Sequence, residues 1–289
     1  MFGPRREDVT EPREHFRMQA ALARTFPELG VTRTGSRAAR IGAFAFEIWS
    51  RLFVDGPPAE PDERARELSW VAENMCALHG VRATVLGQPP KQPCLLVANH
   101  VSYFDPMIIT SLTPCTAVAK REVASWPCVG ELMRRLGVLY VDREDAVSGA
   151  RVLRQAMRCF ERGVSVLVFP EGTTTHGRDV LPFKRGSFGA AALAGVPIVP
   201  VALRYERANA AWVGDDPFLP HYVRTMSRAY TRVTVEFLPA LEARRPSSAD
   251  ACSLAEQARR AIDDALQSCG QSSVTRVPRL SDGWSVASA

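Results

Sequence analysis

The first hydrophobic pattern along the chain is helical. Between Ile41 and Phe53 apolar residues recur at intervals of three and four, which predicts a helix with one apolar face. Aromatic residues crowd this face, arginines precede it at 33–40, and an Asp-Gly-Pro-Pro run from Asp55 ends it. The pattern suits a helix that lies in a membrane interface, and it equally suits a helix that packs on the protein's own core. A second helix is predicted from Pro61 to Gly80, where the glycine caps its end.

Beyond residue 80 the pattern changes to short β-rich runs that alternate with helical stretches, among them helices predicted at 146–162 and 186–194. This alternation predicts an α/β fold with a mostly parallel or mixed sheet flanked by helices, preceded by N-terminal amphipathic helices. The expected strands lie at 81–86, 94–98, 116–119, 138–141, 164–169, 197–203 and 233–238.

The predicted organisation follows from these changes of pattern. The expected segments are a polar arm at 1–40, a helical membrane-docking region at 41–80, the α/β domain at 81–245, a C-terminal helix at 246–269 and a flexible tail at 270–289. A Ser-x-x-Glu pattern at 253–256 fits a capping box at the start of the C-terminal helix.

Charge and cysteine content narrow the classes of partner. The formal charge of +5 favours an anionic partner, which could be nucleic acid, a phosphorylated substrate or membrane headgroups. The arginines are scattered without an aromatic-basic array or zinc spacing, so we expect no nucleic-acid binding. Seven cysteines without a Cys-x-x-Cys pair or a metal-like cluster indicate free thiols in a reducing compartment. Neither a signal peptide nor a transmembrane helix is expected.

The stretch Asn-His-Val-Ser-Tyr-Phe-Asp-Pro carries the first candidate chemistry. Asn99 and His100 follow a predicted buried strand, at the carboxyl end where α/β sheets place ligand sites. Asp105 before Pro106 predicts an N-cap with proline at the first helical position, across a tight loop from the histidine. A carboxylate bonded to one imidazole nitrogen raises the basicity of the other, as a general base requires. The alternative is a capping aspartate beside an unrelated loop histidine.

Two further strands end in polar residues. The strand at 164–169 runs into a glycine-containing loop whose N–H and hydroxyl groups can bind an anion or oxyanion, formed by Glu171, Gly172, Thr173 and Thr174. In this loop Glu171 can bind a hydroxyl or anchor a cation. The strand at 138–141 leads to Arg143, which can clamp a phosphate or form a surface ion pair. Polar clusters after three strands predict one site at a shared edge of the sheet.

Together these residues resemble the glycerolipid acyltransferases, a family that includes 1-acylglycerol-3-phosphate acyltransferases. The family's Asn-His-x4-Asp motif matches Asn99, His100 and Asp105, and its Gly-x-x-aromatic-aliphatic-Asp-Arg motif matches 137–143. Its Phe-Pro-Glu-Gly-Thr motif matches 169–173, and its apolar Val-Pro-Ile-Val-Pro-Val motif matches 196–201. All four motifs occur here in the family's order.

The resemblance implies a mechanism. His100, oriented by Asp105, takes the proton of a lysolipid hydroxyl, and that hydroxyl attacks the thioester of acyl-CoA or acyl carrier protein directly. With 1-acyl-sn-glycerol-3-phosphate as the acceptor the product is phosphatidate, and no cofactor or metal is expected. Arg143 is expected to hold the acceptor's phosphate, and Lys184 is either an anion contact or a surface lysine. The resemblance also assigns to substrate binding Asn99, Glu171, Gly172, Thr173 and Thr174.

One departure leaves the acceptor open. Phosphatidate-forming relatives often have a basic residue where this chain has Thr174, and the segment 212–221 looks more like a bacterial branch that includes lyso-ornithine-lipid acyltransferases. Arg178, in the same loop, is a candidate replacement for the missing charge. Trp212, Asp215 and Asp216 either shape the acceptor pocket or close a loop. A membrane-borne acceptor predicts a peripheral protein on the cytoplasmic side of the membrane, docked by residues 41–80.

Other interpretations compete with this one. Ser187 lies in Arg-Gly-Ser-Phe-Gly, one residue short of the nucleophile elbow of serine hydrolases, and it follows a predicted loop instead of a strand. A non-catalytic lipid-binding module of the same fold would lack the histidine or the aspartate, and both are present here. His176 is an alternative base, but it has no carboxylate at a matching offset.

Overall fold

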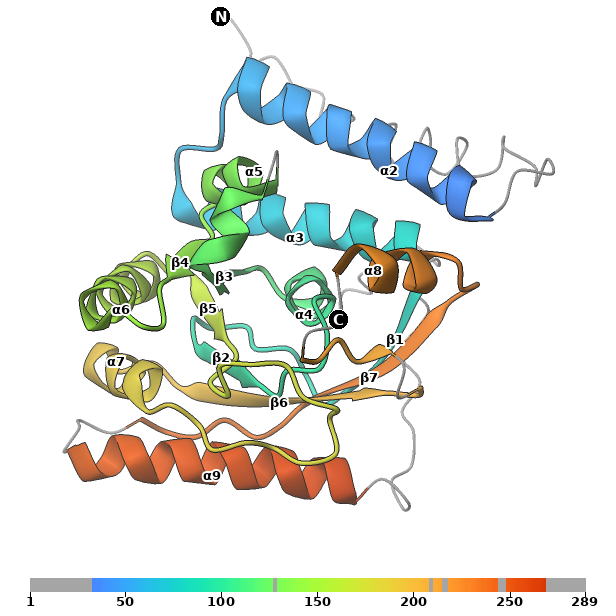
Figure 1. Cartoon of the computed structure of the whole chain (residues 1–289). Helices are drawn as coiled ribbons and strands as arrows, with labels where there is room; N and C mark the ends of the chain where they lie inside the picture. Colours follow the sequence, from blue (N-terminus) through green and yellow to red (C-terminus); the bar gives the residue numbers. More distant parts are fainter. Residues whose placement is uncertain (1–32, 127–128, 208–209, 215–217, 244–247, 269–289) are drawn as a thin grey trace, which may run out of the picture.

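The fold is a single mixed sheet between layers of helices (Figure 1). The computed structural model describes residues 33–126, 129–207, 210–214, 218–243 and 248–268. Over these ranges seven strands form one sheet, in the order β1 (Val81–Leu86), β7 (Thr231–Phe237), β6 (Ile198–Tyr205), β2 (Leu95–Ala98), β5 (Ser165–Val168), β3 (Cys115–Lys120) and β4 (Leu139–Val141).

Strand directions confirm the predicted mixed sheet. From β6 through β2, β5 and β3 to β4 all neighbours are parallel, whereas β7 runs antiparallel to β6 and parallel to β1. The strand β2 is buried along its whole length. Strands covered on both faces read as continuous apolar runs, which explains why this part of the sequence shows no alternation.

The helices divide between the two faces of the sheet. Leu96 and Ala98 of β2 belong to a cluster with residues of α3 and α4, while Leu95 and Val97 belong to a cluster with residues of α6, α7 and α9. The helical elements in the described ranges are α2 (Arg33–Ser50), η1 (Arg51–Asp55), α3 (Pro61–His79), α4 (Asp105–Leu112), η2 (Arg121–Ser125), α5 (Val129–Arg135), α6 (Ala146–Glu161), α7 (Gly186–Ala194), α8 (Phe218–Met226) and α9 (Ser248–Gln267). None of these helices is long and apolar enough to cross a bilayer.

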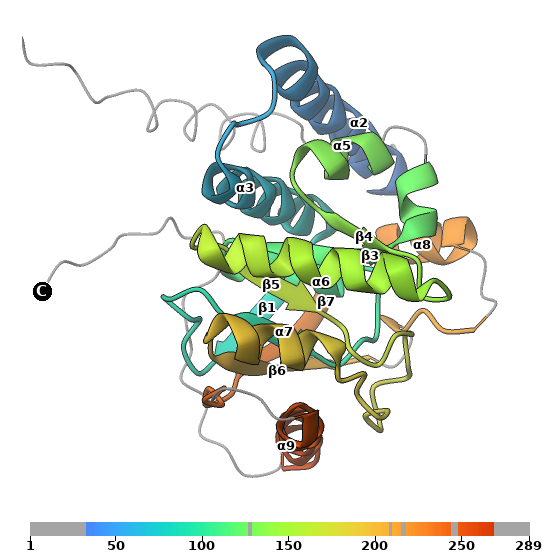
Figure 2. The same cartoon turned by 90° about the vertical axis from the view of Figure 1, so that its left-hand side faces the viewer.

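Helix α2 lies outermost, beyond α3, at the opposite end of the molecule from α9 (Figures 1 and 2). It begins at Arg33, so residues 33–40 are helical, whereas they were expected to form part of a polar arm. The reason is tertiary: the guanidinium of Arg37 donates to the backbone carbonyl oxygens of Met226, Arg228 and Ala229. These acceptors lie far away in sequence, and local patterning cannot reveal them.

The interpretation of the first apolar helix as packed on the protein's own core is confirmed for one of its faces. Phe44, Ile48 and Leu52 are buried in a cluster with residues of α3, so this face packs on the protein's own core. Phe46 and Trp49 are exposed by 69% and 47%, and they point away from that cluster. The aromatic residues of this helix are therefore divided between a buried face and an exposed face. A spacing of three or four residues in the sequence does not tell the two faces apart.

Helix α3 and its end follow the sequence closely. It runs from Pro61 to His79, and Gly80 caps it in the left-handed conformation with φ of 69°. A Cβ atom at Gly80 would lie 2.7 Å from Arg37 Nη2 and 2.8 Å from the carbonyl oxygen of Ala229. Glycine is therefore required here by conformation and by space.

Two helices differ from what the sequence analysis gave. Helix α9 begins at Ser248, so Ser253 and Glu256 lie inside it and form no capping box. Ser253 accepts a hydrogen bond from Gln257, and Glu256 pairs with arginines one turn further on, which are ordinary partners along a helix surface. Helix α8, from Phe218 to Met226, was not predicted, and Pro220 lies in its first turn, where a proline is tolerated.

Candidate active site

Three polar segments meet at one edge of the sheet, as predicted. His100 follows β2, Glu171 follows β5, and Arg143 follows β4. Because these strands belong to the parallel part of the sheet, their carboxyl ends face the same way. Among the described residues, no group of three or more His, Cys, Asp or Glu side chains is placed to hold a metal ion.

Asn99 fixes the point where the chain leaves the sheet. It is buried, and its side-chain amide donates to the carbonyl oxygen of Leu203 at 3.0 Å and accepts from the N–H of Leu203 at 2.8 Å. The amide thus continues the pairing of β2 with β6 beyond the last strand residue. Its contacts are to the protein's own backbone, so its effect is to set the position of His100.

His100 and Asp105 form the contact that their spacing predicted. The imidazole Nδ1 lies 2.9 Å from Asp105 Oδ2. Because the carboxylate accepts, Nδ1 carries the proton and Nε2 is the basic nitrogen. The side chain of His100 is 17% exposed and that of Asp105 is fully buried. The structure gives Nε2 no hydrogen-bond partner among the described residues, so this nitrogen can meet a substrate.

The Asp105 carboxylate organises the loop instead of capping the helix. Oδ2 also accepts from the backbone N–H groups of Val101 at 2.6 Å and Ser102 at 2.8 Å, both before the helix. Helix α4 begins at Asp105 itself, with Phe104 as its N-cap and no side-chain capping bond. The predicted N-cap was therefore wrong by one residue, because the loop's own amides and the imidazole take up the carboxylate.

Tyr205 completes the surroundings of Asp105, and the sequence reasoning missed it. Its hydroxyl donates to Asp105 Oδ1 at 2.6 Å from the carboxyl end of β6. Burial, followed by the nearby charge of Asp105, raises the pKa of Tyr205 well above its ordinary value, so the hydroxyl stays a donor. The available signal was the position of Tyr205, at the end of a strand adjacent to β2.

Glu171 ties the loop after β5 to the histidine. The carboxylate is buried; Oε1 accepts from the backbone N–H of His100 at 2.7 Å and Oε2 from that of Leu181 at 3.1 Å. Burial raises its pKa, and the two amide hydrogen bonds act in the opposite direction. Both oxygens thus contact backbone amides, so in this structure Glu171 joins the two loops.

Gly172 brings two cationic side chains together. Its carbonyl oxygen accepts a hydrogen bond from Arg143, which is half-buried. Burial lowers the pKa of the Arg143 guanidinium. Gly172 has φ of 78°, and an added Cβ atom would lie 3.1 Å from Lys184 Nζ, so the lysine ammonium lies over the glycine. Arg143 and Lys184 therefore form one basic group beside the loop after β5.

The rest of that loop has mixed exposure. Thr173 is exposed and Thr174 is partly buried, while Thr175 donates through its backbone N–H to the carbonyl oxygen of His100 at 2.7 Å. The side chain of Arg178 is exposed, and the structure gives it no contact with Thr174. His176 is also exposed and no carboxylate contacts it in the described ranges, which disfavours it as the base.

An aromatic surface supports the histidine and the neighbouring loop. The imidazole of His100 stacks on Phe169, with ring centroids 4.1 Å apart. Trp212 donates its backbone N–H to Val101 at 3.0 Å, and its ring meets Tyr103 edge to face. Trp212 thus packs against the catalytic loop, while the neighbouring Asp215 and Asp216 lie outside the described residues.

The serine-hydrolase alternative has no geometric support. Ser187 is the second residue of α7, which follows a long loop instead of a strand. The structure gives it no hydrogen bond to a histidine within the described ranges. A nucleophile elbow needs a sharp strand-to-helix turn and a base within reach, and neither is found at this serine.

A histidine aligned by a buried carboxylate at the carboxyl edge of an α/β sheet is an arrangement suited to proton abstraction. The model of the Acyltransferase family matches residues 81–204. A lyso-ornithine lipid O-acyltransferase of Pseudomonas aeruginosa is 36% identical over 210 residues, which are 70% of this chain and 79% of the relative. The chain belongs to the acyltransferase family, and it is an acyltransferase.

Two further similarities agree with this assignment. A 1-acyl-sn-glycerol-3-phosphate acyltransferase of Neisseria meningitidis is 30% identical over 172 residues, which are 58% of this chain and 67% of the relative. The solved structure of the 1-acyl-sn-glycerophosphate acyltransferase PlsC from Thermotoga maritima superposes with a TM-score of 0.55 at 20% identity. That match covers 80% of this chain and 96% of PlsC, and it shows that the two share a fold.

Proposed function

We propose that the enzyme transfers a fatty acyl group from an acyl thioester, either acyl-CoA or acyl carrier protein, to the free hydroxyl of a membrane lysolipid. The observation that carries this proposal is the 2.9 Å contact between His100 Nδ1 and the buried carboxylate of Asp105. It leaves Nε2 as a base at the partly exposed side of the ring. The names of the relatives, which act on lyso-ornithine lipid and on 1-acyl-sn-glycerol-3-phosphate, support a lysolipid acceptor.

The reaction balances without a covalent acyl-enzyme. His100 Nε2 takes the hydroxyl proton as the hydroxyl oxygen attacks the thioester carbonyl carbon. The tetrahedral intermediate then expels the thiolate, which takes the proton back from the imidazolium. The products are an ester and a thiol, and Asp105 stabilises the imidazolium between the two steps.

Two acceptors are supported by different observations. Arg143 and Lys184 beside Gly172 suit an acceptor with a phosphate, such as 1-acyl-sn-glycerol-3-phosphate. Thr174 offers a hydroxyl where phosphate-binding relatives often carry a basic residue. Together with the 36% identity to a lyso-ornithine lipid O-acyltransferase, it supports an acceptor with an ornithine headgroup.

A direct competition tests the function and the acceptor together. Purified enzyme is given lysophosphatidate, lyso-ornithine lipid and lysophosphatidylcholine in one vesicle population, with labelled acyl-CoA or acyl carrier protein, and His100→Ala serves as the blank. Ester formation on one lysolipid that disappears in the blank supports the proposal. Thioester hydrolysis without any labelled lipid, or equal labelling by the blank, would contradict it.

The exposed face of α2 is our proposal for membrane docking. Phe46 and Trp49 of α2 and Phe53 of the following η1 stack in a row, with ring centroids 6.2 and 5.4 Å apart. Val54 of η1 is also exposed, by 72%. Aromatic side chains on one helix face, in a chain of net charge +5, suit the interface of an anionic bilayer.

Matched substitutions test the docking face. Phe46 is 69% exposed and Leu193, on α7, is 66% exposed. Phe46→Glu should weaken partition onto anionic vesicles by about tenfold, since burying one large apolar side chain contributes roughly 1.5–3 kcal/mol. Leu193→Glu should leave it unchanged. Equal partition of both variants in a flotation assay would rule out α2 as the docking surface.

A further inference from the structure

Helix α6 presents an exposed row of arginines. Arg151, Arg154 and Arg158 recur at intervals of three and four residues, which places them along one face of the helix, and all three are exposed. The opposite face packs into the core through Ala156 and Phe160. The three arginines, the arginine face, therefore form the outward surface of α6.

The side chains around the arginine face do not neutralise its charge. Within the described part of the chain, its three guanidinium groups have no ion pair and no hydrogen bond. The helix itself contains one acidic residue, Glu161 in its last turn, and Asp145 before it caps the first turn. Arg162, which ends the helix, is already paired with Glu60 at 3.5 Å. The arginine face thus keeps positive charge that a partner can neutralise.

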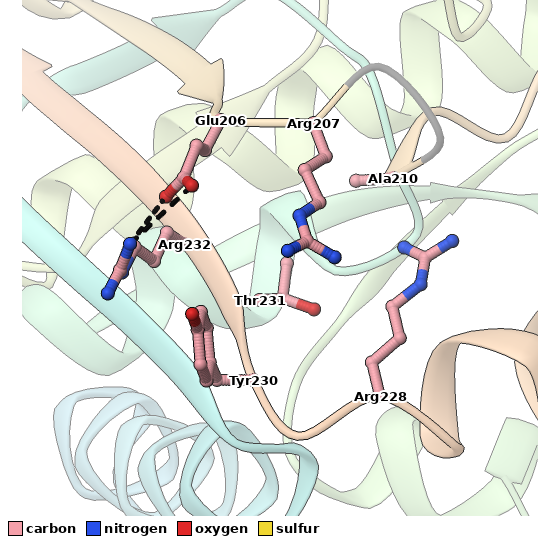
Figure 3. Close-up of a pocket in the computed structure, with 7 residues that line it drawn as sticks. All are labelled: Glu206, Arg207, Ala210, Arg228, Tyr230, Thr231 and Arg232. Carbon is pink, nitrogen blue, oxygen red and sulfur yellow. Dashed lines mark hydrogen bonds and ion pairs between the residues drawn. The ribbon is translucent and has the colours of Figure 1, made fainter.

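The arginines that follow β6 are arranged differently. Figure 3 shows Arg232 paired with Glu206, at 3.1 Å between their charged groups, and the same arginine lies 4.7 Å from the ring centre of Tyr230. The space that these residues help to line is about 10 Å³, roughly what one water molecule needs. That cluster is partly neutralised and too small for a large ligand, whereas the arginine face projects from the surface of a helix.

The arginine face is connected to the catalytic edge through α7. Leu153, on the flank of α6, lies so close to Gly186 that an added Cβ atom there would be 3.4 Å from its Cδ1. Gly186 is the first residue of α7. Two residues earlier, Lys184 lies over Gly172, in the loop whose glutamate holds the backbone of His100. A basic surface therefore runs from α6 toward the catalytic histidine.

The direction of α6 agrees with this connection. The helix begins at Ala146, three residues after Arg143 at the carboxyl end of β4, and it ends before β5 begins. At a rise of 1.5 Å per residue, Arg151 and Arg158 lie about 8 and 18 Å along the axis from that beginning. The arginine face thus starts near the edge that holds His100 and extends away from it.

A membrane fits the arginine face less well than an acidic protein does. A helix that binds a bilayer interface inserts its apolar face, and the apolar face of α6 is buried inside this protein. Figure 2 shows α6 across the side toward the viewer, whereas α2, which carries the exposed aromatic residues, lies along the upper side. A row of unpaired arginines on a helix is complementary to carboxylates on the surface of another protein.

We propose that the arginine face binds the acidic surface of the acyl carrier protein that delivers the acyl thioester. This inference rests on the proposed acyl transfer and chooses between its two donors. Acyl carrier proteins are small acidic proteins that hold the thioester on a flexible phosphopantetheine arm, so the carrier docks beside the catalytic site while its arm enters it. It docks on α6 while α2 stays on the bilayer.

Donors with and without the carrier protein test this assignment on the full-length enzyme. The combined substitutions Arg151→Gln, Arg154→Gln and Arg158→Gln should raise KM for a purified bacterial acyl-acyl carrier protein by about tenfold and leave kcat unchanged, the combined scale of three surface ion pairs. The kinetics of acyl-pantetheine, which lacks the protein, should not change. Higher ionic strength should raise KM for the protein-bound donor more in the wild type than in this variant.

A matched control variant removes three positive charges elsewhere. Arg66 on α3 is 59% exposed, Arg260 on α9 is 70% exposed, and Lys91 is exposed in the loop before β2. With all three changed to glutamine, KM for the protein-bound donor should stay close to that of the wild type. The assignment is overturned if both variants behave alike, if KM for acyl-CoA rises as much as KM for the protein-bound donor, or if the α6 variant loses only its partition onto anionic vesicles.

Equilibrium binding separates this inference from the proposed function. Fluorescence anisotropy of labelled holo-acyl carrier protein should give His100→Ala a Kd about tenfold lower than His100→Ala combined with the three α6 substitutions. If the wild-type enzyme acylates no lysolipid while this difference persists, the proposed function fails and the docking surface stands. If acylation proceeds but the two Kd values agree, the docking surface alone is refuted.

Discussion

Two histidines near the catalytic loop differ in what their second ring nitrogen meets. His221 is buried; its Nδ1 lies 3.2 Å from the Tyr103 hydroxyl and its Nε2 lies 3.1 Å from the carbonyl oxygen of Ala211. His100 uses Nδ1 for Asp105, and among the described residues nothing bonds its Nε2. One ring thus holds α8 against the loop, and the other presents a basic nitrogen to a substrate.

The difference explains why His100, and not His221, is the proposed base. An imidazole with both nitrogens bonded to protein groups cannot exchange a proton with a substrate without breaking a hydrogen bond. Burial raises the pKa of the Tyr103 hydroxyl to about 12, so it remains a donor to His221. At His100 the partner is an acceptor instead, which directs the proton to Nδ1 and the lone pair of Nε2 outward.

The largest effect should separate these two histidines. His100→Ala removes the base and should lower kcat by about 10³-fold, within the usual range for general base catalysis. His221→Ala should retain kcat and lower the free energy of unfolding by about 1–3 kcal/mol, because it removes a buried ring and its hydrogen bonds to Tyr103 and Ala211. Single-turnover kinetics and urea unfolding of both variants give the answer. Equal losses of kcat would remove the distinction.

An intermediate effect should come from the residue that holds the carboxylate. Tyr205→Phe removes the donor to Asp105 Oδ1 and should lower kcat about tenfold with KM unchanged, since the base is less well positioned. Because the pKa of Tyr205 lies well above its ordinary value, the ratio of wild-type to variant kcat should stay constant between about pH 6 and 9. A change in KM alone would place Tyr205 in substrate binding instead.

The smallest effect should come from a third histidine and concerns stability. His79 is buried, with Nδ1 2.7 Å from the carbonyl oxygen of Met75 and Nε2 2.8 Å from the Tyr222 hydroxyl. Burial lowers its pKa, so its neutral form stabilises the fold above its ordinary pKa of 6.5, and that stability is lost as pH falls through the lower folded value.

The measurement compares unfolding at two pH values. Between about pH 7 and 5, wild-type protein should lose more free energy of unfolding than His79→Gln, whose side chain does not titrate. Urea unfolding followed by circular dichroism provides both values. An identical pH dependence in the two proteins would mean that His79 does not contribute to acid sensitivity.

Most of the fold could be predicted because its signals are local. Apolar runs bounded by turn residues identified the strands, and Gly80 marked the end of α3. The exceptions have tertiary causes. Residues 33–40 are helical, and Arg37 among them donates hydrogen bonds to the backbone carbonyl oxygen of Met226 and to carbonyl oxygens that follow it. Helix α9 begins before its apparent capping box.

The contact between His100 and Asp105 could be predicted from the sequence for a similar reason. His100 and Asp105 lie five residues apart, so one loop brings them together, and the identity of the motif residues is visible in the chain. The contacts of Glu171 and Tyr205 are different, since they join segments separated by 71 and 100 residues. Only packing of β5 and β6 beside β2 brings them into range.

The sequence by itself determined the strands, the helical periodicity, the contact between His100 and Asp105, and the resemblance to acyltransferases, because each depends on residues close together in the chain. The tertiary structure alone decided which aromatic residues of α2 are covered and what holds Asp105. These outcomes depend on which strands become neighbours, and strand order is set by the collective packing of both sheet faces.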